Sequence, residues 1–203
     1  MHQERIAEIC NFWFGQLDGG WTKEDKKNLW WYCPPETDEY IASTFASLHR
    51  CANLGELNDW QETPKGCLAL IIVLDQFSRT IHRKTAQAFA SDNEALTICL
   101  SAIDSKKDTA LTPVERAFLY IPLMHSENLD HHDTALVLYN RLVDLVEARH
   151  REAALGFVKG AEIHRDLISR FGRYPHRNLV LGRKSTPSEL AYLDADPETF
   201  GQG

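Results

Sequence analysis

Apolar side chains recur at three- and four-residue intervals along most of this chain, the spacing that places them on one face of an α-helix. The stretches with this spacing are residues 3–15, 36–52, 92–103, 113–125, 130–150 and 151–171. No segment convincingly shows the alternation of apolar and polar residues that is typical of a half-buried β-strand. The pattern therefore predicts an all-α protein.

The stretch from Cys67 to Phe77, CLALIIVLDQF, is apolar on every side rather than on one face. A helix with this composition is buried in the centre of a protein. Thr63 and Pro64 come just before it, and proline at the first helical position costs no intrahelical hydrogen bond. So short an apolar run could also be a buried strand, but its length and flanking residues favour a helix. We therefore expect the central helix here.

Several residues indicate where the other helices begin and end. Thr112 and Thr186 are each followed by proline and then, at the third position, by glutamate, the pattern of a capping box. Pro122 falls late in its helix and is expected to kink or end that helix near His125. Gly172 fits the C-terminal cap of the helix before it.

These signals predict seven to eight helices with short connections, in one compact domain that covers residues 1–203. A chain of this length fits a single domain. The expected arrangement is a helical-hairpin array, although no repeat of fixed period is visible. Residues 195–203 are expected to form a loose tail.

Composition narrows the classes of function. The chain is 43% hydrophobic and 25% charged, and its net charge of -7 argues against nucleic-acid binding. It has no long apolar run for a membrane span and no signal-peptide pattern at its N-terminus. We therefore expect a cytoplasmic protein without membrane or nucleic-acid partners. Its five cysteines are widely spaced and are expected to be reduced: Cys10, Cys33, Cys51, Cys67 and Cys99.

One segment departs from this acidic character. Between His164 and Lys184 there are six basic residues and one acid. Such a segment forms either a surface for an anion or a set of charge partners for acids elsewhere in the fold. Arginine suits both roles, because its guanidinium binds carboxylates and phosphates through two parallel hydrogen bonds. His164 itself begins an apolar stripe and is expected to be a core histidine.

Three groups of polar residues stand at predicted helix ends. They are Asp75, Gln76 and Arg79; His125, Ser126 and Glu127; and Arg173, His176, Arg177 and Asn178. If the central helix is buried, the Asp75 carboxylate needs a partner, and Arg79, four residues on, is the nearest candidate. The groups either converge on a pocket, or tie the helices together as a structural network, or lie exposed at helix ends.

No motif in the sequence identifies a reaction. There is no HExxH or other metal-ligand spacing, no glycine-rich phosphate loop and no GxSxG nucleophile motif. We therefore expect no metal site of known spacing. The cofactor, if there is one, stays unknown.

Six short motifs, taken together, resemble one protein family. They are FWFG (Phe12–Gly15), LDQFSR (Leu74–Arg79), AFASD (Ala88–Asp92), PLMHSE (Pro122–Glu127), RFGRYPHRN (Arg170–Asn178) and LGRKSTPSEL (Leu181–Leu190). Over nearly the whole chain they are similar to the bacterial domain-of-unknown-function 924 family. The chain departs from that family at Ser78 and Thr80, where LDQFPRN is typical.

The resemblance implies a compact all-α fold similar to tetratricopeptide-repeat proteins. It implies no established activity, substrate or cofactor. Carried over position by position, the polar motif of the family falls on the same three groups of residues, with Asp75 and Arg79 unaffected by the departures.

Two classes of function are compatible with these observations. In the first, the polar groups form one pocket that binds a small anionic metabolite, and the protein is either an enzyme or a binding protein. Ligand-binding or orienting residues would be Asp75, Gln76, Arg79, Arg173, Arg177 and Asn178, and proton transfer would fall to His125, Glu127 and His176. Asp75 and Glu127 would orient the histidines or bind a divalent ion. In the second class, the helices present a groove to a protein or peptide partner, and the polar groups are structural.

Overall fold

The fully apolar stretch forms the centre of the fold in the computed structural model, which describes residues 2–32, 34–195 and 197–202. Helix α3 (Pro64–Ile71) continues through a π-helical turn at Ile72–Phe77 into α4 (Ser78–Ile81). Every residue from 66 to 75 is buried, so the prediction of a buried central helix is confirmed. The Thr63 hydroxyl accepts the Gly66 backbone N–H at 3.1 Å and caps its start.

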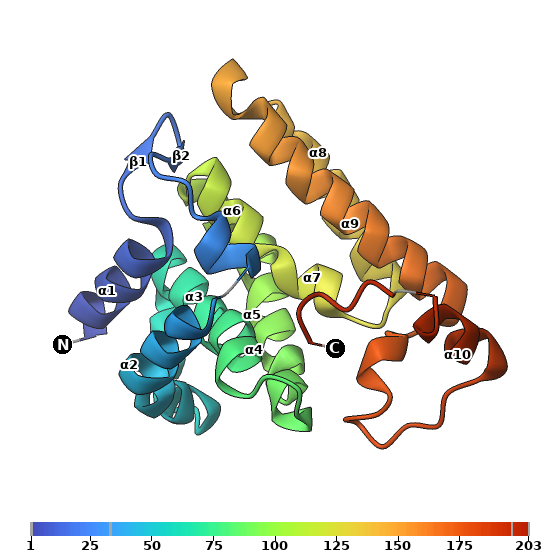
Figure 1. Cartoon of the computed structure of the whole chain (residues 1–203). Helices are drawn as coiled ribbons and strands as arrows, with labels where there is room; N and C mark the ends of the chain where they lie inside the picture. Colours follow the sequence, from blue (N-terminus) through green and yellow to red (C-terminus); the bar gives the residue numbers. More distant parts are fainter. Residues whose placement is uncertain (1, 33, 196, 203) are drawn as a thin grey trace.

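Four amphipathic helices pack around this centre (Figure 1). They are α1 (His2–Phe14), α2 (Pro35–Asn53), α5 (Asp92–Asp104) and α6 (Pro113–Leu119). Each of them buries the apolar face that its sequence spacing predicts. The driving force is the removal of these faces from water, which is roughly proportional to the apolar area buried.

The second half of the chain forms a long helical hairpin. Helices α8 (Leu129–Val143) and α9 (Arg151–Phe171) run side by side, and α7 (Ile121–His125) packs against both of them (Figure 1). Gly172 ends α9 in the left-handed conformation, with φ +69°, as expected of a C-terminal cap. Helix α10 (Pro187–Leu193) follows the basic segment.

Both predicted capping boxes are present, but the effect of Pro122 differs from the prediction. The helix breaks at Tyr120, before the proline, and Pro122 lies in the first turn of α7, which ends at His125. Proline lacks the N–H that a helix interior requires, whereas the first turn leaves that donor unpaired in any case. Pro122 therefore starts a helix rather than bending one.

The all-α class is confirmed. With α3–α4 and α6–α7 each counted as one helix, the described residues hold eight α-helices. One departure is a small antiparallel hairpin of two-residue strands, β1 (Leu17–Asp18) and β2 (Trp21–Thr22), joined by Gly19 and Gly20 with positive φ. The likeness to tetratricopeptide-repeat proteins stays a prediction.

Short non-α turns fill the connections. The 3₁₀ turns are Asn58–Glu62, Ala86–Phe89, Lys107–Ala110, Ala148–His150 and Pro175–Arg177, and a π-helical turn covers Asn28–Tyr32.

The end of the chain lies against the body of the protein instead of forming the expected loose tail. The Phe200 ring stacks on His164 of α9, with 3.9 Å between ring centroids. The Gln202 side chain is buried and donates to the backbone oxygen of Arg79 at 3.2 Å. Ring stacking and a buried amide hydrogen bond hold this segment in place. Both contacts are with residues far away in the sequence, so the local pattern does not predict them.

Four cysteines are free thiols in the structure. Cys10, Cys67 and Cys99 are buried and Cys51 is partly exposed, while Cys33 lies outside the described residues. Among the helices that the structure describes, none is both long enough and apolar enough to cross a membrane.

Candidate functional site

A cavity of about 440 Å³ lies where α7, α9, the end of the central helix and the C-terminal segment come together. Figure 1 shows the C-terminal segment, in dark red, running beside α7 below α9. A cavity of this size is typical of sites for small organic ligands. Five of the residues singled out in the sequence line it: Gln76, Arg79, His125, His176 and Arg177.

Asp75 lies just behind this wall and holds His125 in place. The carboxylate is fully buried, and His125 Nδ1 donates to Asp75 Oδ2 at 2.7 Å. Gln76 Nε2 donates to the other carboxylate oxygen at 2.6 Å. Burial by itself raises the pKa of Asp75, but the adjacent His125 and Arg79 outweigh it and lower that pKa below its usual value. Asp75 is therefore an ionised acceptor for the imidazole.

Arg79 is not hydrogen-bonded to Asp75 among the described contacts, although the i to i+4 spacing predicted this pair. A π-helical turn, with hydrogen bonds between residues five apart, covers this part of the central helix. Asp75 points to His125, and Arg79 instead binds Asp92 at the start of α5, with Nη2 2.9 Å from Oδ2. π-Helical turns are rare and are frequent at functional sites.

Arg79 and Arg177 share a single carboxylate. Arg177 Nη1 is 3.1 Å from Asp92 Oδ2, the same oxygen that accepts from Arg79. Both guanidinium carbons lie 4.6 Å from the ring centroid of Phe89, in cation–π contact. The two side chains are largely buried, at 12% and 7% exposure. Two buried cations thus meet one anion in the wall of the cavity.

Burial is the main cause of the lowered pKa values of the lining groups, and neighbouring positive charges add to it. Burial, and then the charge of Arg79, lower the pKa of Arg177 to about 10. Burial lowers the pKa of His176 to about 3, and the positive charges of Arg177 and Arg79 contribute. His164 has a pKa of about 3, chiefly through burial and then through His125. Both imidazoles are therefore neutral at neutral pH, in an electropositive cavity.

Three buried polar atoms of the lining residues have no hydrogen-bond partner among the described residues. They are Trp13 Nε1, His176 Nδ1 and Arg177 Nε. Buried polar atoms are paired in the great majority of cases, so each such atom needs an explanation. These three atoms have almost no accessible surface, so they lie behind the cavity wall and do not face the open space.

Glu127, Arg173 and Asn178 lie away from the cavity lining and hold the basic segment in its fold. Glu127 accepts from the Tyr174 backbone N–H at 2.8 Å and from Arg183 at 2.7 Å. Burial tends to raise the pKa of Glu127, but its hydrogen bond with Arg183 lowers it. Contacts of this kind are what we expect if the polar groups tie the helices together as a structural network.

A second carboxylate, Glu189 of α10, also holds the basic segment, and together with Glu127 it forms a clamp on that segment. Arg173 binds its two carboxylate oxygens at 2.6 and 2.8 Å, and Asn178 Nδ2 lies 3.3 Å from one of them. The hydrogen bonds with Arg173 lower the pKa of Glu189 to about 2. The basic segment is therefore divided: Arg177 and His176 face the cavity, and Arg173 and Asn178 secure α10.

Sequence reasoning missed the aromatic part of the cavity. Trp13, Trp30, Trp31, Phe157 and Phe200 also line it, and they come from four separate parts of the chain. The cluster at Trp30 and Trp31 was visible in the sequence, but its neighbours are not. Phe157 lies 5.5 Å from Trp31 between ring centroids, and only the fold brings these two rings together.

Two glycines in the middle of α9 were missed as well. Gly156 and Gly160 line the cavity one helical turn apart. A Cβ atom added at either would have no heavy atom of the described residues within 4 Å, apart from its chain neighbours and its own helix backbone. Glycine in a helix interior costs about 0.5–1 kcal/mol relative to alanine. Close packing does not require these glycines, so they keep space open.

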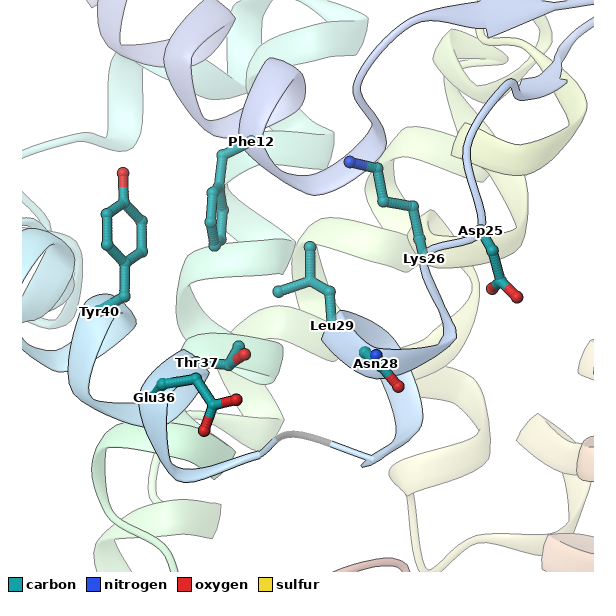
Figure 2. A pocket seen from close by; sticks show the side chains of 8 residues that line it. All are labelled: Phe12, Asp25, Lys26, Asn28, Leu29, Glu36, Thr37 and Tyr40. Carbon is teal, nitrogen blue, oxygen red and sulfur yellow. The ribbon is translucent and has the colours of Figure 1, made fainter.

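A second hollow, of about 430 Å³, is lined by residues of α1, α2 and the loop between them (Figure 2). Phe12 and Tyr40 stack there with 5.2 Å between ring centroids, and Lys26 forms an ion pair with Glu24 at 3.0 Å. None of the three predicted polar groups lies in this hollow. The cavity beside α9 is therefore the candidate site.

The cavity has acids and histidines but no cluster of metal ligands. Within the described parts of the chain, no three His, Cys, Asp or Glu side chains are grouped so that they could hold a metal ion. What the arrangement can do chemically is bind negative charge at Arg79 and Arg177 and accept a proton at His125.

Comparisons with known proteins agree with the fold and name no chemistry. Residues 9–196 match the family described as bacterial protein of unknown function (DUF924). A solved structure of a protein of unknown function from Agrobacterium tumefaciens is 31% identical, with a TM-score of 0.77 over 96% of this chain and 99% of that chain. A search of the curated proteins gives no match. Neither description states an activity, a substrate or a partner.

Proposed function

Because the chain belongs to the DUF924 family of bacterial proteins of unknown function, we propose a function from its cavity: it binds a small organic anion between Arg79 and Arg177. The observation that carries this proposal is the pair of buried guanidiniums that share Asp92. A carboxylate or phosphate group matches the geometry of the guanidinium fork and would supply the missing negative charge.

Three other carboxylates lie near the two arginines: Asp75, Glu127, which pairs with Arg183, and the exposed Glu198 in the cavity lining. None of them is hydrogen-bonded to Arg79 or Arg177 among the described contacts. Asp75 is fully buried and its two oxygens are taken up by His125 and Gln76. The charge of Asp75 acts on Arg79 electrostatically, but its described hydrogen bonds are with His125 and Gln76 and not with Arg79. An anion beside Arg177 would restore its pKa toward the usual value, because it would offset both the burial and the repulsion from Arg79.

His125 is the candidate proton acceptor of the site. Its Nδ1 donates to the ionised Asp75, so in the neutral ring Nε2 is the basic nitrogen. A carboxylate behind an imidazole fixes the ring orientation and stabilises the imidazolium that forms on proton uptake. This pair suits general-base chemistry on a bound ligand or on water, so the site could serve an enzyme of this kind.

The other predicted residues have different roles in this proposal. His176 and His164 are neutral donors or acceptors in the wall, since their pKa values are held near 3. Glu127, Arg173 and Asn178 stabilise the segment that carries Arg177. The alternative, a helical module for a protein partner, stays a prediction, as does the cytoplasmic location. Trp30 is buried and Trp31 is 51% exposed, and both line the cavity.

The proposal is tested by thermal shift and titration calorimetry with benzoate and phenyl phosphate. A ligand at about a hundredfold its dissociation constant stabilises by about 2.7 kcal/mol, which raises the melting temperature by about 2–4 °C for a chain of this size. We expect such a shift for wild type with at least one probe, and about half of that shift or less in Arg177→Ala at the same probe concentration. Losing a charge-assisted bidentate contact should weaken binding by about tenfold or more.

Arg170→Ala is the matched control. Arg170 belongs to the same basic segment but forms an exposed ion pair with Asp166, at 3.3 Å, away from the cavity. This variant should bind the probes as wild type does. Equal loss of binding in both variants would attribute the effect to overall charge. The proposal fails if neither probe binds to wild type, or if Arg177→Ala binds with unchanged affinity.

A further inference from the structure

The cavity changes in character along α9. At its polar end His164 lies 6.0 Å from His125, between ring centroids, and His164 Nδ1 donates to the Gly160 carbonyl at 2.8 Å. At the other end Phe157 lies against Trp31. From His164 to Gly156 the helix rises by about 12 Å, at 1.5 Å per residue. The lining therefore passes from charged groups to aromatic rings over the length of a two-ring molecule.

The open face of α9 lies between these two ends. Gly156 and Gly160 leave a smooth strip of helix backbone there, without side chains that would interrupt a flat ligand. Trp31 stands at the mouth with 51% exposure, and Gly156 is exposed as well. Aromatic rings pack favourably face to edge and offset against such walls, beyond the gain from buried area.

The charge at the polar end favours an anionic ligand. Arg79 and Arg177 share the carboxylate of Asp92 there. An anionic group would balance the second guanidinium, which a pure hydrocarbon would not do.

We propose that the cavity takes an elongated anion with a planar aromatic body, and that Gly156 and Gly160 set the permitted length of that body. The inference rests on the proposed function and adds the ligand class to it. The anionic group lies at Arg79 and Arg177, the first ring passes over Gly160, and the second reaches Gly156 and the rings of Trp31 and Phe157.

A graded set of carboxylates tests the ligand class: acetate, benzoate, biphenyl-4-carboxylate and decanoate, titrated into wild type by calorimetry. We expect the affinity to rise in the order acetate, benzoate, biphenyl-4-carboxylate, by about tenfold for the second ring. Decanoate has a flexible chain of comparable length and should bind more weakly than biphenyl-4-carboxylate. The same series with phenyl phosphate and biphenyl-4-yl phosphate distinguishes a carboxylate from a phosphate as the preferred anion.

Two variants of α9 test where the aromatic body of the ligand lies in the cavity. Gly156→Leu should weaken biphenyl-4-carboxylate by about tenfold and leave benzoate within about threefold, because its side chain occupies only the far part of the cavity. Gly160→Leu should weaken both probes. Ser169→Leu, at an exposed position of the same helix that is turned away from the cavity lining, is the control and should change neither affinity. Leucine favours helix over glycine, so both glycine variants should melt at or above the wild-type temperature.

The outcomes separate this inference from the proposed function. If none of the carboxylates or phosphates binds to wild type, the proposed function itself fails. If benzoate binds but the second ring adds no affinity, or decanoate equals biphenyl-4-carboxylate, the aromatic assignment is overturned and anion binding stands. If Gly156→Leu and Gly160→Leu bind every probe as wild type does, these glycines do not limit the ligand.

Discussion

At the scale of single residues, removing Asp92 leaves two cations without their partner, whereas removing Arg177 leaves Asp92 paired with Arg79. Asp92 is the carboxylate that Arg79 and Arg177 share, whereas Arg177 is one of two cations competing for it. Removing one partner of a buried ion pair strands the other charge, and this stranding dominates the cost. The structural-network alternative and the anion site therefore predict different stabilities for variants at these two positions.

We expect Asp92→Ala to lower the free energy of unfolding by about 3–5 kcal/mol, because it strands two guanidiniums beside each other. Arg177→Met should cost clearly less, since Asp92 keeps Arg79 as its partner and the repulsion between the two guanidiniums is removed. Urea unfolding of both variants measures the difference. If Arg177→Met proved as destabilising as Asp92→Ala, Arg177 would act mainly as a structural clamp.

At the scale of elements, the basic segment and α10 act as one unit that carries Arg177 to the cavity. Glu189 joins them, because it accepts from Arg173 and from the Thr186 backbone N–H at 2.7 Å as part of the α10 capping box. The central helix is the second such element, since its Asp75 holds His125. Both elements also supply lining residues: Gln76 comes from the central helix, and His176 and Arg177 come from the basic segment.

Glu189→Ala should therefore loosen the segment from Gly172 to Leu193. The loss of the cap and of a partly exposed ion pair should lower the free energy of unfolding by about 2 kcal/mol. Limited trypsin digestion should cut this segment, at Arg183 or Lys184, faster than in wild type. Arg165→Ala serves as control, because its exposed pair with Asp133 joins α9 to α8, away from α10, and contributes about 1 kcal/mol or less. Unchanged cleavage in Glu189→Ala would contradict the clamp.

At the scale of the whole molecule, the buried imidazoles link stability to pH. His164 and His176 have pKa values near 3 in the folded protein, against 6.5 in the unfolded chain. Between these values the unfolded chain binds protons that the folded protein excludes. The free energy of unfolding should then decrease as the pH falls from about 6.5 toward 4.

His164→Phe tests this linkage, because phenylalanine keeps the ring that stacks on Phe200 and removes the titration. Each such group contributes a slope of up to about 1.4 kcal/mol per pH unit. Chemical unfolding at pH 7, 6, 5 and 4 should show a shallower loss of stability in the variant than in wild type. If the plots of unfolding free energy against pH were parallel for the variant and wild type, the pKa of His164 would be the same in the folded and unfolded states.

The sequence by itself determined the helices and their ends. Apolar spacing and caps are local, so α1, α2, α8, α9 and the capping boxes at Thr112 and Thr186 follow from residues only a few positions apart. The buried central helix follows from composition in the same way. The break at Tyr120 was not predicted, because the effect of Pro122 depends on which turn of a helix it occupies.

Which charges meet depends on how distant segments pack. Sequence spacing paired Asp75 with Arg79, but the packing of α7 and α5 on the central helix pairs Asp75 with His125, fifty residues away, and Arg79 with Asp92. The same holds for the cavity, whose glycines, rings and C-terminal segment come from distant parts of the chain. Helix formation is governed by neighbours in sequence, whereas a binding site depends on contacts between distant segments, which no local pattern encodes.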